Sequence, residues 1–185
     1  MIEFEVRFPL QRNVSKELIR LGLKKKDTYS MADLIFHPRD WPHGKKICPG
    51  YFIVRIRLVK GKKPRMEMKE FLDKDSWRET GFEISDPKGA ATILSKVLLP
   101  LYPIVKQREI WRKGKIEVSV DNVDHLGKYI EIEGKKTEVE KVANSLGFSI
   151  ESSKRNYGTQ LWYLREKGKI KLGQKDIESI LRKFI

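Results

Sequence analysis

The chain has 185 residues, of which 39% are hydrophobic and 35% are charged. This composition is typical of a globular protein with a buried core, and it excludes an intrinsically disordered chain. Lysine and arginine outnumber the acidic residues by 39 to 25, which gives a net charge of +14. Such a field attracts polyanions, so nucleic acid, nucleotides and polyphosphate are the expected classes of ligand.

Cysteine usage and hydropathy narrow the class of protein further. Cys48 is the single cysteine, so a disulfide within the chain is excluded. The sequence has no run of eighteen apolar residues and does not start with the apolar core of a signal peptide. We therefore expect a cytoplasmic protein that does not contact a membrane, folded as a single domain over residues 1–185.

The first predicted element is a strand over residues 2–8. Glu3, Glu5 and Arg7 alternate there with apolar residues, which is the period-two pattern of a strand with one polar face. The polar side chains of this strand should therefore share one side of a sheet.

A helix and a loop are expected next. The helix should cover residues 14–22 and end at Gly22, because glycine tolerates the left-handed conformation at a helix end. Residues 24–50 are basic and contain several prolines and glycines, so they predict a long loop or flap.

The middle of the chain predicts three strands and a helix. The helix should start with Asp86 as its N-cap and Pro87 at its first position, and end near Pro100. Its apolar residues, including Ile93 and Val97, should be buried. The three strands alternate with period two and cover residues 51–59, 65–71 and 80–84.

Further strands and helices follow toward the C-terminus. Lys113-Gly114 should form the turn of a hairpin. Thr137 and Glu140 have the spacing of a capping box, which predicts a helix over residues 137–147, and a second, amphipathic helix should end the chain at 175–185. The remaining strands are predicted over residues 104–111, 115–121, 129–133 and 159–166.

Together these elements predict a mixed α+β fold. We expect a mostly antiparallel, closed or nearly closed barrel of eight strands that forms a tunnel, with the helices packed outside. The apolar faces of the strands would then contact the helices, and the polar faces would line the lumen.

The charges on the polar faces are sorted by sign. Arg55 and Arg57 share one face of their strand, whereas Glu131 and Glu133 share one face of another. A solvent-facing sheet explains any single strand, but not this sorting. Like charges inside a barrel would be costly to desolvate unless a ligand, a metal ion or water satisfied them.

The two sets of charges have complementary chemistry. Clustered carboxylates bind hard divalent ions such as Mg²⁺ or Mn²⁺, which are often shared with phosphate oxygens. Arginine and lysine bind the phosphates themselves. The sequence therefore indicates a site for a metal-bound polyphosphate.

In their order along the chain, these residues resemble the CYTH, or triphosphate tunnel metalloenzyme, superfamily. The resemblance covers about residues 1–165, and "IFHPRDW" at 35–41 looks like the archaeal class IV adenylyl cyclase branch. The family usually has a lysine where Arg7 stands. The motifs that carry the resemblance are Glu3, Glu5 and Arg7, the pair Arg55 and Arg57, Lys69, the pair Lys106 and Arg108, and "DNVDHLGKYIEIE" at 121–133.

The resemblance implies a role for each of these residues. One or two divalent ions, Mg²⁺ or Mn²⁺, would be held by Glu3, Glu5, Asp121, Glu131 and Glu133. The triphosphate would be bound by Arg7, Arg55, Arg57, Lys69, Lys106 and Arg108. Glu5, Lys69 and Glu133 would be catalytic. Tyr157 would be a further substrate contact.

Several activities stay open at this stage. Members of this family hydrolyse thiamine triphosphate, inorganic triphosphate or nucleoside triphosphates, or convert ATP to cyclic AMP and pyrophosphate. We expect a triphosphatase, since water is always available as the nucleophile, with a cyclase as the alternative. A non-catalytic module that binds RNA or polyphosphate is a weaker alternative, and a homodimer is compatible with any of these. His37, His43 and Cys48 match no familiar spacing of zinc ligands.

Overall fold

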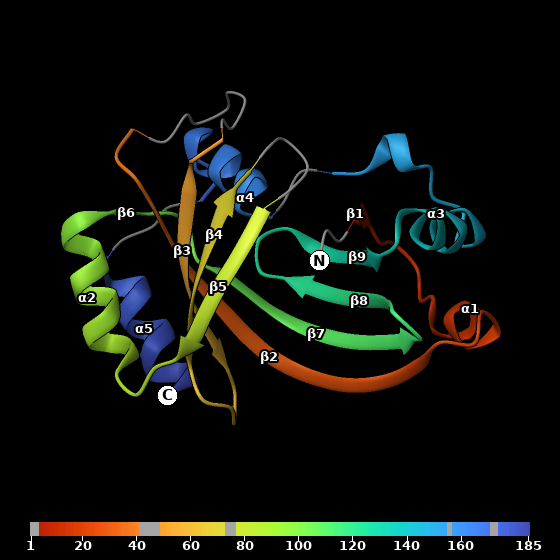
Figure 1. The fold of residues 1–185 in the computed structure, drawn as a ribbon, viewed down its shortest axis with the longest axis horizontal. Helices are drawn as coiled ribbons and strands as arrows, with labels where there is room; N and C mark the ends of the chain where they lie inside the picture. Colours follow the sequence, from red (N-terminus) through yellow and green to blue (C-terminus); the bar gives the residue numbers. More distant parts are fainter. Residues whose placement is uncertain (1–3, 41–48, 73–76, 155–156, 171–173) are drawn as a thin grey trace. The chain divides into compact units, whose positions relative to one another are not determined.

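The computed structural model of the protein describes residues 4–40, 49–72, 77–154, 157–170 and 174–185 (Figure 1). The predicted metal ligand Glu3 lies outside these residues, as do His43 and Cys48. The chain divides into two compact units. Unit 1 contains residues 1–29 and 106–156, and unit 2 contains residues 30–105 and 157–185.

Unit 1 is built from antiparallel strands and short helices. The strand order is β1-β9-β8-β7, followed by the first part of β2, where Lys25 pairs with Glu109 at 3.2 Å. Its elements are β1 (Phe4–Pro9), α1 (Ser15–Arg20), β2 (Lys24–His37), β7 (Ile104–Lys113), β8 (Ile116–Val123), β9 (Gly127–Gly134), α3 (Lys136–Ser145) and the 3₁₀ helix η1 (Ile150–Ser152).

The apolar faces of these strands form the core of unit 1. Apolar residues that alternate along β1, β8 and β9 form one buried cluster with residues of α1 and α3, as the period-two pattern requires. Phe8 stacks on Phe148 with 4.7 Å between the ring centroids. Because the apolar side chains occupy this face, the charged side chains of the same strands lie on the opposite one.

Unit 2 contains the second part of β2 and the remaining strands. The antiparallel order is β2-β3-β4-β5, and β6 pairs with the end of β2. Its further elements are β3 (Phe52–Val59), β4 (Arg65–Phe71), β5 (Trp77–Glu83), α2 (Pro87–Val97), β6 (Leu99–Pro100), α4 (Tyr157–Glu166) and α5 (Gln174–Phe184).

The core of unit 2 lies between its strands and two helices. Leu34, Phe36 and Ile56 are buried and form a cluster with Ala91 of α2 and Leu181 of α5. Figure 1 shows α2 and α5 side by side next to β3. The even-numbered face of β2 is therefore apolar, which places Asp33, Ile35 and His37 on the other face.

The structure confirms the mixed α+β class and the largely antiparallel sheet, with nine strands among the described residues in place of the predicted eight. Two elements were predicted wrongly. Residues 24–37 form a strand and not a loop. The pattern did not indicate a strand because residues 31–37 are buried throughout, so polar and apolar side chains do not alternate there. Residues 159–166 belong to helix α4, whose buried residues Tyr157 and Leu161 are four apart.

The helix ends are partly as predicted. Asp86 caps α2 by accepting a hydrogen bond of 2.8 Å from the backbone N–H of Gly89, and Pro87 follows it. Burial was predicted wrongly, however: Ile93 and Val97 are 66% and 62% exposed, since Ala91 lies on the side that meets the core.

The capping box predicted for α3 is wrong. The helix starts at Lys136, so Thr137 lies inside it, and no side chain caps it. No described helix combines the length and the apolarity that a membrane crossing needs.

Candidate functional site

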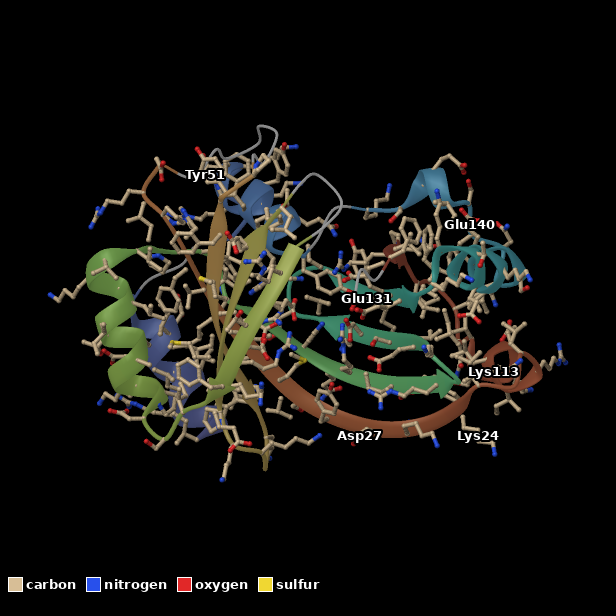
Figure 2. All side chains as sticks on the ribbon, in the orientation of Figure 1. Lys24, Asp27, Tyr51, Lys113, Glu131 and Glu140 are labelled. Atoms are coloured by element: carbon tan, nitrogen blue, oxygen red, sulfur yellow. The ribbon has the colours of Figure 1, made fainter. Side chains whose placement is uncertain are left out.

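The polar faces of β1, β7, β8 and β9 bring together seven charged residues of unit 1. We call this set the carboxylate cluster, and Figure 2 labels one of its members, Glu131 on β9. Strand register creates the cluster, since Glu5 lies opposite Glu133 and Arg7 opposite Glu131. Its members are Glu5, Arg7, Lys106, Arg108, Asp121, Glu131 and Glu133.

Asp121 is the most deeply buried member, with none of its surface exposed. Its carboxylate accepts hydrogen bonds from Nε and Nη2 of Arg108, both at 2.7 Å, and from Nζ of Lys106 at 2.9 Å. Two cations therefore neutralise one carboxylate, which offsets much of the cost of burying it.

Glu131 connects two arginines. Its carboxylate accepts a hydrogen bond from Nε of Arg7 at 2.7 Å and one from Nη2 of Arg108 at 2.9 Å. Burial alone would raise the pKa of Glu131, but the positive charges of Arg7, Arg108 and Lys106 hold that pKa far below its usual range. Glu131 is therefore ionised at neutral pH. Arg7 is also ion-paired with Glu5.

Three of these carboxylates fit a divalent ion. Glu5, Glu131 and Glu133 each offer an oxygen, and the three oxygens lie within 4.8 Å of one another. Oxygen donors at such separations are the ligands that Mg²⁺ and Mn²⁺ prefer. The cluster also has four carboxylates against three cations, so an added cation improves its charge balance.

A second charged set lies on one face of β2, β3, β4 and β5 in unit 2. We call it the arginine cluster, and register again creates it: Asp33 lies opposite Arg57, Glu67 opposite Arg55, and Glu79 opposite Lys69. Its members are Asp33, Arg55, Arg57, Arg65, Glu67, Lys69 and Glu79.

The two central arginines are held by carboxylates. Arg57 donates from Nε and Nη2 to the two oxygens of Asp33 at 2.8 and 2.9 Å, which is a bidentate pair. Arg55 donates from Nε to Glu67 at 2.8 Å. Four cations face three carboxylates in this cluster, and Glu83, opposite Arg65, pairs with Lys63 at 3.3 Å, so the charge balance favours an anion.

Lys69 pairs with the remaining carboxylate of this cluster. Its Nζ lies 2.9 Å from Oε1 of Glu79. Burial would raise the pKa of Glu79, but the charge of Lys69 lowers it below the usual value.

The structure thus collects the predicted site residues into two groups. Glu5, Arg7, Lys106, Arg108, Asp121, Glu131 and Glu133 meet in unit 1, and Arg55, Arg57 and Lys69 meet in unit 2. Tyr157 lies at the start of α4 in unit 2 and is 3% exposed, so its contact with a substrate stays a prediction.

Four residues of the arginine cluster were missed from the sequence: Asp33, Arg65, Glu67 and Glu79. Asp33 is 3% exposed and Glu79 faces Lys69, yet neither was a candidate. A signal for Asp33 existed: it is a single acidic residue within the apolar run "MADLIF", and a charge at such a position is buried only with a partner. Because residues 24–50 were predicted to form a loop, Asp33 was not considered as a buried residue of a strand.

Comparison with known proteins identifies the fold and the family. The model of the CYTH domain matches residues 1–155. The chain belongs to the CYTH family. No match was found among curated protein sequences.

Solved structures have the same fold as this CYTH protein. PH1012 from Pyrococcus horikoshii OT3 has a TM-score of 0.70 and 23% identity over 86% of this chain and 98% of its own. A Vibrio parahaemolyticus protein provisionally described as an adenylate cyclase has a TM-score of 0.66 and 11% identity, covering 88% and 98%. A Bacillus halodurans protein with the same provisional description has a TM-score of 0.59 and 18% identity, covering 85% and 97%.

Proposed function

We propose that this CYTH protein is a divalent-metal-dependent triphosphatase. The observation that carries the proposal is the pair of clusters with opposite charge balance, one rich in carboxylates and one rich in arginines. Hydrolysis of a phosphoanhydride needs both parts, because a metal ion and fixed cations must neutralise the charge that spreads over the phosphoryl oxygens.

In the carboxylate cluster, Glu5, Glu131 and Glu133 would hold Mg²⁺ or Mn²⁺. The bound ion would polarise a phosphoryl oxygen and orient the attacking water. Glu131 keeps its charge because Arg7 and Arg108 lower its pKa, so it stays available as a ligand at neutral pH. Asp121, covered by Lys106 and Arg108, would hold those two cations in place for phosphate.

In the arginine cluster, Arg55, Arg57 and Lys69 would bind phosphate oxygens. Each is already oriented by a carboxylate, so little side-chain entropy is lost when a phosphate arrives. Lys69, expected from the resemblance to be catalytic, would also stabilise the charge of the leaving phosphate.

A second candidate is conversion of ATP to cyclic AMP and pyrophosphate. It is supported by the provisional description of the Vibrio and Bacillus proteins as adenylate cyclases. Cyclisation needs the same metal and cations, but the attacking group is a ribose hydroxyl at the α-phosphorus in place of water.

The deciding experiment is product analysis with purified protein. ATP, thiamine triphosphate and inorganic triphosphate are incubated with Mg²⁺ or Mn²⁺, and the products are separated and identified. Release of inorganic phosphate, abolished by a chelator, is the expected result. Cyclic AMP with pyrophosphate from ATP would establish the cyclase instead.

Binding measurements beside the product analysis test the alternative of a binding module. A protein that binds RNA or polyphosphate equally well with and without divalent ions, and turns over none of the three triphosphates, would contradict both enzymatic proposals. Glu5, Glu131 and Glu133 repel a polyanion unless a cation intervenes, which is why we expect metal dependence.

A further inference from the structure

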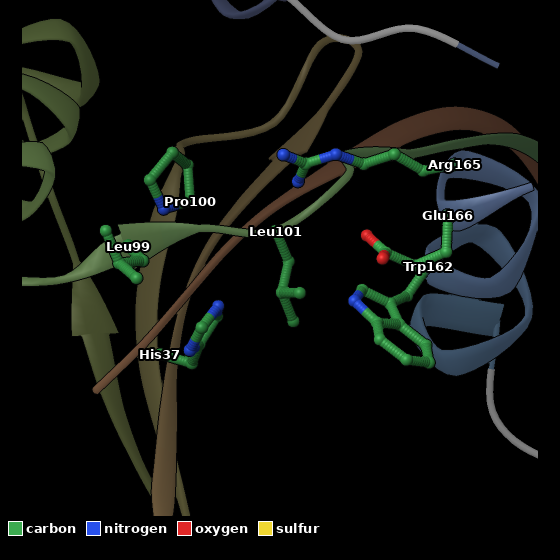
Figure 3. A pocket seen from close by; sticks show the side chains of 7 residues that line it. All are labelled: His37, Leu99, Pro100, Leu101, Trp162, Arg165 and Glu166. Carbon is green, nitrogen blue, oxygen red and sulfur yellow. The ribbon is translucent and has the colours of Figure 1, made fainter. Parts of the chain in front are cut away.

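Unit 2 contains a cavity that the proposed reaction does not use. Its volume is about 340 Å³, and it lies between the end of β2, β6 and helix α4. Figure 3 shows the imidazole of His37, the side chain of Leu101 and the indole of Trp162 in a row, with the carboxylate of Glu166 between Leu101 and Trp162. This volume lies at the lower end of the range of small-molecule sites.

The lining combines a flat apolar surface with polar groups of both kinds. Trp162 is half-buried and offers an indole face, on which a planar ring can stack. Glu166 can accept a hydrogen bond and Arg165 can donate several. These groups match a planar nitrogen heterocycle with an exocyclic amine. Such a ring has two apolar faces that can stack on the indole, and hydrogen-bond donors and acceptors along its edge that can pair with the carboxylate and the guanidinium.

The cavity lies next to the arginine cluster along a single strand. Asp33, Ile35 and His37 share one face of β2, and Ile35 is paired with Arg55. His37 is therefore two residues, or about 7 Å, further along the strand than the pair that contains Arg55. A sugar or a comparable linker can bridge a step of that length between a phosphate and a ring.

A second cavity adjoins the first, since Leu101 and Arg165 line both. Its volume is about 460 Å³, and most of its other lining residues, such as Ala91 and Leu181, come from α2 and α5. Ala91 and Leu181 belong to the core on the even-numbered face of β2, which is the face opposite Asp33 and His37. The part of the second cavity lined by α2 and α5 is therefore on the side of β2 away from the arginine cluster, so a ring whose phosphates are bound there reaches the cavity at Trp162 more directly.

We propose that the cavity at Trp162 binds the ring of an organic triphosphate, a planar nitrogen heterocycle with an exocyclic amine, as in an adenine nucleotide or thiamine triphosphate. This inference rests on the proposed function, since it takes the arginine cluster as the phosphate site. The substrate is then an organic triphosphate and not inorganic triphosphate. Trp162 stacks on the ring, and Glu166 accepts a hydrogen bond from its amine.

Equilibrium binding to the full chain tests the proposal. Titration calorimetry compares ATP, thiamine triphosphate and tripolyphosphate on the wild type and on Trp162→Ala, with Ca²⁺ in place of Mg²⁺ so that turnover is blocked. Trp162→Ala should weaken binding of the organic ligand by about 5- to 150-fold, the range expected for loss of one stacked ring. Its affinity for tripolyphosphate should not change.

Three further variants separate loss of the ring site from misfolding. Trp162→Phe keeps a ring and should bind ATP or thiamine triphosphate nearly as well as the wild type. Glu166→Gln is an exposed change and should weaken only the organic ligands. Glu178→Gln is the matched control, because Glu178 is also an exposed helix carboxylate but lines the second cavity. It should change none of the affinities.

The outcomes separate this inference from the proposed function. If all three ligands bind the wild type equally and Trp162→Ala changes nothing, the ring site is wrong while the triphosphate site stands. If no triphosphate binds the wild type, the proposed function fails and this inference fails with it. Whether ATP or thiamine triphosphate shows the larger loss identifies which ring the cavity accepts.

Discussion

The carboxylate cluster of unit 1 and the arginine cluster of unit 2 are built alike but balanced differently. Both lie on the polar faces of antiparallel strands, and both pair each cation with a carboxylate across or along the sheet. The carboxylate cluster has one carboxylate too many, and the arginine cluster has one cation too many. A difference of one charge in each set decides which ligand each can accept without added repulsion.

Burial differs as well. Asp121, Glu131, Lys106 and Arg108 are all less than a tenth exposed, whereas Arg55 and Arg57 have side chains that are 18% and 26% exposed. Ion pairs in the carboxylate cluster should therefore matter for stability, because a buried charge that loses its partner is costly. Those of the arginine cluster should matter more for ligand binding, since solvent screens them in the free protein.

The largest effect is expected from Glu131→Gln. Removing this charge leaves Arg7 and Arg108 without a shared partner, and loss of one member of a buried ion pair costs about 3–5 kcal/mol of unfolding free energy. Urea denaturation measures this loss. Glu133→Gln, on the same strand and face, is the control and should cost clearly less. Equal losses in both variants would contradict the role given to Glu131.

The pH dependence of stability sharpens that prediction. Neighbouring cations lower the pKa of Glu131 from its usual 4.5, so its contribution is complete above that pH and is lost as the pH falls through the lower folded-state value. Wild-type unfolding free energy should therefore fall between about pH 5 and pH 3. The Glu131→Gln variant should fall less over the same range. Parallel curves for the two proteins would contradict the assignment.

A loss of turnover without a comparable loss of stability is expected from Glu133→Gln. One of three metal-binding oxygen groups becomes neutral, and metal polarisation is worth several kcal/mol, so turnover should drop by at least about 100-fold. Initial rates over a titration of Mn²⁺ measure this change. Unchanged rates at low Mn²⁺ would remove Glu133 from the metal site.

A smaller effect, on substrate affinity, is expected from Arg57→Ala. A charge-assisted hydrogen bond to phosphate is worth about 1.5–3 kcal/mol, so the Kd for a triphosphate should rise about 10- to 150-fold. Arg65→Ala is the matched control, because Arg65 is on the same face but 46% exposed and lies 3.4 Å from Glu67. If the two variants weaken binding equally, a general basic field explains the affinity better than a defined site.

The smallest effect is expected from Glu79→Gln in the arginine cluster. The side chain of Glu79 is 47% exposed, so solvent screens its ion pair with Lys69. Loss of its charge should change the unfolding free energy by less than about 1 kcal/mol. Urea denaturation beside Glu131→Gln gives the direct contrast between the two clusters. A cost as large as that of Glu131→Gln would show that burial does not separate them.

Much of the site could be predicted because its residues alternate along single strands. Glu131 and Glu133, or Arg55 and Arg57, are two apart, so each pair shares a face whatever the partner strand is. Asp33 could not be predicted in this way, since the strand around it is buried on both faces and lacks an alternating pattern. The segment that forms helix α4 was predicted as a strand because "TQLWYL" also alternates over a few residues. Only the packing of α4 within unit 2 showed that its buried residues have helical spacing.

The order of charges along the chain, their strand faces and the match to the CYTH pattern were determined by the sequence alone. Only the tertiary structure decided that Glu131 joins Arg7 to Arg108, that Asp33 holds Arg57, and that His37 and Trp162 line one cavity. The reason is physical: periodicity depends on neighbours along the chain, whereas register, burial and pKa depend on residues that are distant in sequence and meet only when the strands pair.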